Sequence, residues 1–147
     1  LAIRYFNVFG PRQDPTSQYS GVIAKFMTAA INGSTYTING DGTQGRDFSY
    51  IDNVVHANLL ALKAPRLSGE VVNVACGEMY TLLDLTAAID QAAGTRLEVI
   101  HRQPRVGDVM YSKAAIGAAE SLLGYRPQVD FYEGVRRTYE WYRSRAL

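Results

Sequence analysis

The spacing of apolar residues along this chain predicts an alternation of helices and strands. Apolar residues that recur every three or four positions indicate amphipathic helices, and they do so over residues 21–32, 51–64, 81–94 and 130–145. Shorter apolar runs bounded by turn-forming residues indicate strands, at residues 1–6, 35–39, 70–75 and 97–102. The pattern therefore predicts a protein of the α/β class.

The predicted elements carry further local signals. The apolar runs at 1–6 and 70–75 are nearly continuous, which is typical of strands in a parallel sheet covered on both faces, so both are predicted to be buried. Thr81 and Asp84 have the spacing of a capping box at a helix start. Asp52 is expected to be the N-cap of the helix over 51–64.

Composition and charge narrow the classes of function. The 147 residues are enough for one domain with a core, 47% of them are hydrophobic, and the net charge is +1. No polybasic surface for nucleic acid or membrane is implied. No apolar run approaches the roughly 18 residues of a membrane span, and no secretory signal opens the chain. A cytoplasmic location is therefore expected.

Two residue types that often carry chemistry are scarce. Cys76 is the only cysteine, so it cannot form an intrachain disulfide, and we interpret it as a buried structural thiol. His56 has no second histidine or cysteine at ligand spacing. The sequence therefore predicts no metal site.

The most distinctive stretch is glycine-rich and spans residues 40–52. Gly40, Gly42 and Gly45 fit the G-x-G-x-x-G of a dinucleotide-binding turn, but that fingerprint needs a helix that opens on its last glycine. The residues after Gly45 are charged and aromatic and have no helical period. We predict instead a hairpin, in which a tight turn joins the strand over 35–39 to a second extended segment.

Three motifs match a known family position by position. Residues 4–13 read R-x-F-N-V-F-G-P-R-Q, residues 40–50 read G-D-G-x-Q-x-R-D-F-x-Y, and residues 105–112 read R-x-G-D-V-x-x-S. Together they resemble the motifs of the extended short-chain dehydrogenase/reductase family, which contains NAD-dependent nucleotide-sugar epimerases and dehydratases. The resemblance covers essentially the whole chain.

The resemblance implies a domain organisation, a cofactor and a ligand. Residues 1–147 would be the C-terminal part of a Rossmann-type enzyme, in which the last sheet strands, at about 1–6 and 70–75, join a mixed α/β substrate-binding lobe. The N-terminal NAD-binding domain would lie outside this chain. The ligand would be a UDP-sugar. Sheet surfaces left open in this way would favour a homo-oligomer.

The resemblance also assigns substrate-binding residues. Three of them would hold the substrate diphosphate, namely Asn7, Arg46 and Arg105. Asp108 would accept hydrogen bonds from the ribose. Four more would border the nucleotide, namely Gly21 and Val22 at a helix start and Thr37 and Asn39 beside the nucleobase. Ser112, a small residue, would set the size of the sugar pocket and admit a UDP-N-acetylhexosamine.

The same residues have simpler interpretations when the family is set aside. Asn7 would be an amide that caps a loop over residues 7–15, and Thr37 and Asn39 would belong to a hairpin arm. Arg105 and Asp108 would form a salt bridge in a solvated loop. These alternatives stay open on the sequence alone.

Two features of the family are missing from this sequence. It contains no G-x-x-G-x-x-G turn that opens a Rossmann unit and no Tyr-x-x-x-Lys pair, in which the lysine lowers the pKa of a tyrosine base. Ala24 also replaces the family's usual proline. We therefore expect no catalytic residue in this chain, no binding of NAD by the chain alone, and no turnover without the rest of the enzyme.

Three functions remain compatible with these observations. The chain could be part of a UDP-hexose or UDP-N-acetylhexosamine 4-epimerase, part of a nucleotide-sugar 4,6-dehydratase or decarboxylase, or a folded module without catalysis. The joint presence of Asn7, Arg46, Arg105 and Asp108 favours a protein that still binds nucleotide.

Overall fold

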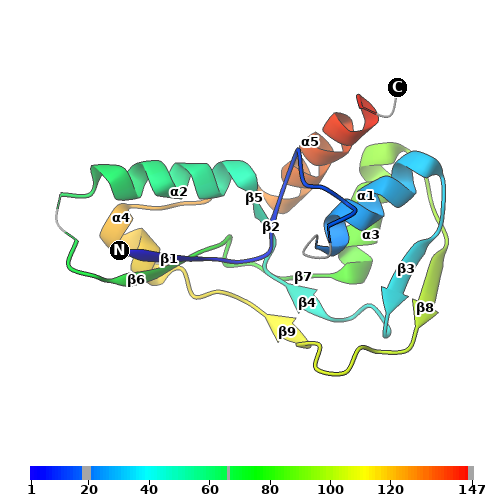
Figure 1. Ribbon diagram of the computed structural model, residues 1–147, viewed down its shortest axis with the longest axis horizontal. Helices are drawn as coiled ribbons and strands as arrows, with labels where there is room; N and C mark the ends of the chain where they lie inside the picture. The colour runs from blue at the N-terminus through cyan, green and yellow to red at the C-terminus, as the bar shows by residue number, and fades with distance from the viewer. Residues whose placement is uncertain (18–20, 66, 146–147) are drawn as a thin grey trace.

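The computed structural model describes residues 1–17, 21–65 and 67–145. Its helices and strands form two lobes that lie side by side (Figure 1), each around a hydrophobic core of its own. The mixed α/β architecture agrees with the predicted class. Short strands and the start of the last helix connect the two lobes.

The first lobe contains two parallel strands and two helices. Strand β1 (Ala2–Tyr5) pairs with β6 (Val71–Val74), and helices α2 (Ile51–Lys63) and α4 (Gly117–Leu123) pack beside them. Its core joins Val72 and Val74 of β6 to residues of α2 and α4. The parallel pairing predicted for the runs at 1–6 and 70–75 is confirmed.

The prediction that both of these strands are buried is wrong. Three of the four residues of β1 are exposed, and Val71 of β6 is 49% exposed. Side chains alternate between the two faces of a strand, and the described residues cover only the face that carries Val72 and Val74. The opposite face is open.

The second lobe holds the larger core. Helices α1 (Val22–Asn32), α3 (Leu82–Ala93) and α5 (Phe131–Arg143) pack on one another and beside a parallel pair of strands, β3 (Tyr36–Asn39) and β8 (Val99–Arg102). Fully buried side chains fill the space between them, including Met27, Tyr36, Ile38, Leu85, Ile89 and Val135. The four long helices lie within two residues of the predicted ranges.

Five two-residue strands link the lobes, and the sequence did not predict them. Strand β2 (Val8–Phe9) pairs with β5 (Ser49–Tyr50), so the expected loop over 7–15 contains a strand. Strand β4 (Gly45–Arg46) lies between β7 (Tyr80–Thr81) and β9 (Tyr111–Ser112).

The predicted hairpin after residue 39 is wrong, because β3 pairs with β8 and not with β4. Gly40 and Gly42 both have positive φ, at 86° and 85°, a backbone that glycine adopts without strain. The amide of Gln44 donates to the main-chain oxygen of Asn39 at 2.7 Å. This side-chain bond closes the turn and leaves β4 free to pair elsewhere. Gly45 opens a strand and not a helix, so the stretch lacks the structure of a dinucleotide fingerprint.

The two predicted helix caps have different outcomes. The capping box of Thr81 and Asp84 is present at the start of α3. Asp52 is not the N-cap of α2, because the helix follows β5 directly and Tyr50 occupies that position without a side-chain bond. Asp52 lies in the first turn of α2 and pairs with Arg137 at 3.4 Å.

One buried carboxylate ties the two lobes together. Asp47 is 0% exposed, and its oxygens accept from the main-chain N–H groups of Cys76, Gly77 and Ala114 at 3.0, 3.0 and 3.2 Å. Burial raises the pKa of this carboxyl, against the effect of the three donors. Asp47 thereby fixes the position of its neighbours Arg46 and Phe48 against the first lobe.

Candidate functional site

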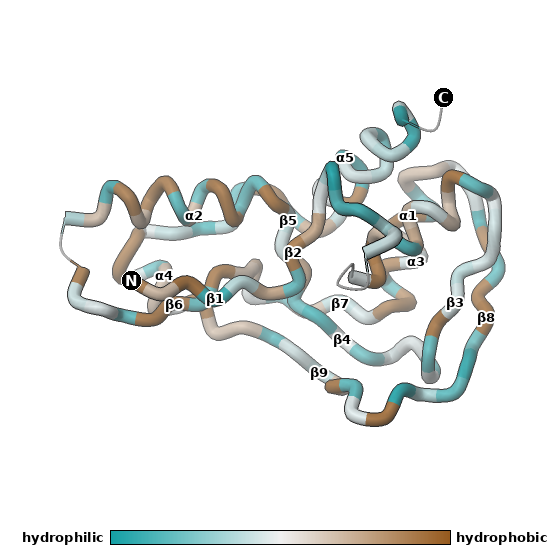
Figure 2. Tube along the Cα trace, viewed as in Figure 1, coloured by the Kyte–Doolittle hydropathy of each residue, from teal (hydrophilic) through white to brown (hydrophobic). Residues whose placement is uncertain are grey.

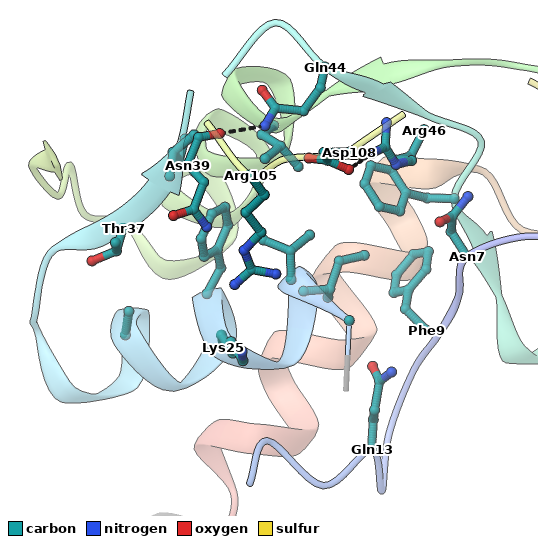
Figure 3. A pocket seen from close by; sticks show the side chains of 18 of the residues that line it. Asn7, Phe9, Gln13, Lys25, Thr37, Asn39, Gln44, Arg46, Arg105 and Asp108 are labelled. Atoms are coloured by element: carbon teal, nitrogen blue, oxygen red, sulfur yellow. Dashed lines mark hydrogen bonds and ion pairs between the residues drawn. The ribbon is translucent and has the colours of Figure 1, made fainter. Parts of the chain in front are cut away.

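A cavity of about 560 Å³ opens between α1, β3, β4 and the loop that follows β8. Its wall is built from segments far apart in the sequence, including residues 7–13, the start of α1 and residues 105–108 (Figure 3). The cavity is of the size that small ligands occupy in proteins.

Eight of the nine predicted substrate-binding residues line this cavity. They are Asn7, Gly21, Val22, Thr37, Asn39, Arg46, Arg105 and Asp108. Ser112 does not line it. Ser112 lies in β9 opposite Arg46 of β4, and its main-chain oxygen accepts from Asp47 N at 2.8 Å. The sheet pairing therefore holds Ser112 beside the cavity wall.

The strongest polar contact at the cavity is an ion pair. Arg46 Nη2 lies 2.6 Å from Asp108 Oδ1, and Arg46 Nη1 also donates to the main-chain oxygens of Gly45 and Met110 (Figure 3). The side chain of Arg46 is 16% exposed and that of Asp108 is 38% exposed. A planar guanidinium held in this way presents a fixed set of donors.

The predicted salt bridge between Arg105 and Asp108 is absent, since Asp108 pairs with Arg46. The two residues meet only through their main chains, where Asp108 N donates to Arg105 O at 3.2 Å. Within the described part of the chain, the guanidinium of Arg105 has no hydrogen-bond partner. Figure 3 shows this side chain beside Asn39, reaching toward α1.

The charges that line the cavity favour an anion. Lys25, Arg46 and Arg105 contribute three positive charges, and Asp108 contributes the single negative one. The whole chain carries a net charge of only +1, so this surplus is local. Partial burial strengthens its attraction for a phosphate group.

Strand β3 presents an open edge to the same cavity. Tyr36 N donates to Glu98 O and Gly40 N donates to Arg102 O, at 2.9 and 2.8 Å. Alternate residues of a parallel strand face opposite neighbours, so the main-chain groups of Thr37 and Asn39 point away from β8. Both residues line the cavity.

Asn7 bridges two segments at the cavity rim. Its Nδ2 donates to the main-chain oxygen of Asp47 at 3.0 Å, and its φ of 37° is positive. The alternative interpretation of Asn7 as a loop-fixing amide therefore describes a real contact. Its Oδ1 has no hydrogen-bond partner among residues 1–17, 21–65 and 67–145.

Five further lining residues were not singled out from the sequence, namely Phe9, Gln13, Lys25, Gln44 and Phe48. Four of them lie inside the first two motifs, and that position was the available signal. Lys25 follows Val22 by three positions on α1, which places both on one face of the helix. The Oε1 atom of Gln13 is shielded from solvent and has no partner among the described residues.

A second hollow of about 590 Å³ lies against the first. The two share Asn39, Gln44, Arg105 and Asp108 in their walls, and the second is completed by the loop over residues 104–110. All residues of that loop are exposed. Arg105 and Asp108 therefore stand on a segment with solvent on one side and the cavity on the other.

The described residues include no group of three or more histidine, cysteine or acidic side chains that could hold a metal ion. His56 lies against the ring of Tyr125, with 6.3 Å between centroids. Cys76, predicted to be buried, is only partly so, and this burial raises the pKa of its thiol to about 11. Within the same residues, no helix has the length and apolar character needed to cross a membrane.

Comparison with known proteins gives a consistent result. The model of the NAD dependent epimerase/dehydratase family matches residues 1–75. The UDP-glucose 4-epimerase of Mycolicibacterium smegmatis is 38% identical over 140 residues, which are 95% of this chain and 44% of that protein.

Solved structures agree closely with the fold. The UDP-glucose 4-epimerase of Thermotoga maritima, determined with UDP-glucose, superimposes with a TM-score of 0.92 at 37% identity, over 99% of this chain and 46% of that one. A UDP-N-acetylglucosamine 4-epimerase from Methanobrevibacter ruminantium, in complex with UDP-N-acetylmuramic acid, gives 0.90 at 39% identity, over 98% and 46%. The chain spans less than half the length of these relatives.

Proposed function

The chain belongs to the NAD-dependent epimerase/dehydratase family, and on that premise we propose that it is the C-terminal, substrate-binding part of a UDP-hexose or UDP-N-acetylhexosamine 4-epimerase. The observation that carries the proposal is the convergence of Asn7, Arg46, Arg105 and Asp108 on one cavity with a surplus of positive charge. These residues come from three separate segments of the chain.

The diphosphate of the ligand is assigned to the two arginines. Guanidinium groups pair with phosphate oxygens through charge-assisted hydrogen bonds. Arg105 has no competing partner, and Arg46 has one carboxylate partner, Asp108. When a diphosphate binds Arg46, Asp108 is released to accept from ribose hydroxyls.

The nucleobase is assigned to the open edge of β3. Its main-chain N–H and C=O groups at Thr37 and Asn39 offer donors and acceptors side by side, as the next strand would use them. A uracil ring carries an N–H flanked by two carbonyl oxygens, and this pattern complements such an edge. Gly21 and Val22 at the start of α1 would form the opposite wall.

The described residues do not fit NAD. The glycine-rich stretch opens β4 and not a helix, and none of the ten tyrosines is followed four positions later by lysine. We therefore assign NAD and the catalytic tyrosine–lysine pair to the remainder of the enzyme. This chain alone is expected to bind substrate without turning it over.

The open side of the first lobe supports this division. Ala2 N donates to Glu70 O and Phe6 N donates to Val74 O, so the main-chain groups of Ile3 and Tyr5 point away from β6. This free edge of β1 could accept a further parallel strand. We propose that residues 1–6 and 70–75 are the last strands of a larger sheet that the remainder of the enzyme completes.

The test of this proposal is a calorimetric titration of UDP into the chain and into two variants, Arg46→Gln and Arg105→Gln. Loss of charge-assisted hydrogen bonds should weaken binding by about tenfold to a hundredfold in each variant. Arg96→Gln is the matched control, because Arg96 is exposed and lies outside the cavity lining. Equal affinities in all four proteins would contradict the assignment.

The identity of the sugar is tested separately at Ser112. In an enzyme completed by its other half, Ser112→Tyr should abolish turnover of UDP-N-acetylhexosamine and spare that of UDP-glucose, since a bulky ring beside Arg46 would narrow the sugar pocket. Equal loss of both activities would show that Ser112, which lies outside the described lining, does not set sugar size.

A further inference from the structure

The wall of the cavity that contains Phe9 and Gln13 rests on the last helix. At Gly134 of α5, an added Cβ would lie 2.9 Å from Phe9 Cζ and 3.0 Å from Tyr50 Cβ. Only glycine permits this approach, so α5 packs directly behind Phe9. The helix is itself fixed, because Val135 is 0% exposed and the Asp130 side chain caps the first turn.

A second contact joins the far end of α5 to the same wall. The hydroxyl of Tyr142 donates a hydrogen bond to the main-chain oxygen of Gln13, 129 residues earlier in the chain. Burial raises the pKa of Tyr142, so the hydroxyl keeps its proton and stays a donor. Figure 1 shows the segment after β2 passing beside α5 before it turns toward α1.

The segment that carries Gln13 needs such support. Arg12 has a φ of 70°, in the left-handed region that non-glycine residues adopt at an energetic cost and keep only where the surrounding structure holds them. Asp14 and Thr16 bond to each other at 2.7 and 2.8 Å within the segment. The bond from Tyr142 instead connects the segment to the core of the second lobe.

Gln13 occupies a defined end of the cavity. Figure 3 shows it on the side of Asn7 and Phe9, away from Thr37 and Asn39. If the base lies at Thr37 and Asn39 and the diphosphate at the arginines, the group beyond the diphosphate lies toward Gln13. The unpartnered Oε1 of Gln13 is an acceptor at that end.

We propose that the hydroxyl of Tyr142 is a positioning group for Gln13, and that α5 thereby sets how the cavity receives the part of a nucleotide sugar beyond the diphosphate. This inference rests on the proposed function. Tyr142 does not line the cavity, so it acts only through the segment that it holds. Its loss should therefore affect a sugar-bearing ligand and leave the nucleoside diphosphate unaffected.

The test compares the affinities of UDP-glucose and UDP by calorimetry in the unaltered chain and in Tyr142→Phe. This substitution removes one hydroxyl, so the preference for UDP-glucose over UDP should fall by about fivefold, the usual effect of one hydrogen bond. Tyr139→Phe is the matched control, because Tyr139 is buried on the same helix and its hydroxyl has no partner among the described residues. It should leave the preference unchanged.

Two further measurements separate positioning from general damage. In a Gln13→Ala background, Tyr142→Phe should have no further effect on the preference, since the two residues act through one another. Hydrogen exchange at residues 10–17 should accelerate in Tyr142→Phe while the melting temperature of the chain stays the same.

The inference fails if Tyr142→Phe weakens UDP and UDP-glucose equally, if it changes neither, or if its effect persists without the Gln13 side chain. It also fails if the unaltered chain binds UDP and UDP-glucose equally. In each of these cases UDP still binds, so the proposed function survives. Absence of UDP binding by the unaltered chain would remove both.

Discussion

At the scale of single residues, the pairing of Arg46 with Asp108 suggests how the cavity is kept ready for an anion. The 2.6 Å contact aligns a guanidinium that would otherwise be flexible, and it balances one of the three cations in the lining. A ligand diphosphate would replace the carboxylate as the partner of Arg46. Asp108 thus holds the arginine before binding and is available to the ribose afterwards.

Asp108→Ala separates these two roles. Removing the carboxylate should strengthen the binding of inorganic pyrophosphate by about threefold to tenfold, because Arg46 loses its competitor. The affinity for UDP should fall relative to that of pyrophosphate, since the ribose loses an acceptor. Competition titrations with the two ligands measure the ratio. An equal rise for both would mean that Asp108 does not contact the ribose.

Cys76 provides a prediction with a pH dependence. Its pKa is raised from 9.0 to about 11, first by burial and then by the nearby Asp47 carboxylate. Alkylation at pH 8 should therefore be about a hundredfold slower than in the urea-unfolded chain, because the thiolate is the reactive form.

The sign of the stability effect follows from the same shift. A raised pKa in the folded state means that the Cys76 thiol contributes stability below pH 9, and that this contribution is lost as the pH rises toward about 11. Alkylation rates measured from pH 7 to 11 should rise throughout. A plateau near pH 9 would show that the thiol is not shielded.

At the scale of elements, the start of α3 is stabilised by reciprocal hydrogen bonds. Asp84 N donates to the Thr81 hydroxyl at 3.0 Å, and Thr81 N donates to the Asp84 carboxylate at 2.8 Å. Thr81→Ala should lower the free energy of unfolding by about 1 kcal/mol. Urea denaturation measures the change, and Thr95→Ala, at an exposed position beyond the same helix, is the control. Equal effects would contradict the role of the cap.

Long helices were predictable from the sequence, because each has an apolar stripe that repeats within one segment. The ends of α3 illustrate this, with its capping box at Thr81 and a left-handed Gly94 after its last turn. The two-residue strands were not predictable. Strand β4 exists because β7 and β9 come to it from distant segments, and no local period records such a pairing.

The same distinction explains the outcome at the candidate site. Motifs located eight of the lining residues, because each motif is a local string of residues. They could not show that Asp108 pairs with Arg46 across 62 positions. They also could not show that Tyr142 of the last helix reaches Gln13. Contacts between segments required the fold.

At the scale of the whole molecule, the first lobe has an unfinished surface. Figure 2 shows hydrophobic residues along α2, and three of them lie on its outer side, with Val55 50%, Leu59 51% and Leu62 82% exposed. Together with the open edge of β1, they form an apolar surface of the kind that proteins normally cover.

We therefore expect the isolated chain to self-associate through this surface. Leu59→Lys combined with Leu62→Lys should shift the chain toward the monomer in sedimentation experiments, since the charges oppose burial. Val106→Lys is the control, because Val106 is fully exposed in a loop outside this lobe. A chain that is strictly monomeric at high concentration before any substitution would contradict the expectation.

The central claim is that this chain holds the substrate-binding half of a nucleotide-sugar enzyme without its cofactor half. A calorimetric titration of the unaltered chain with UDP, and in parallel with NAD, tests it most directly. The account predicts saturable heat with UDP and none with NAD, because the arginines converge on a cavity while the dinucleotide fingerprint is missing. Binding of neither ligand, or of NAD in place of UDP, would contradict it.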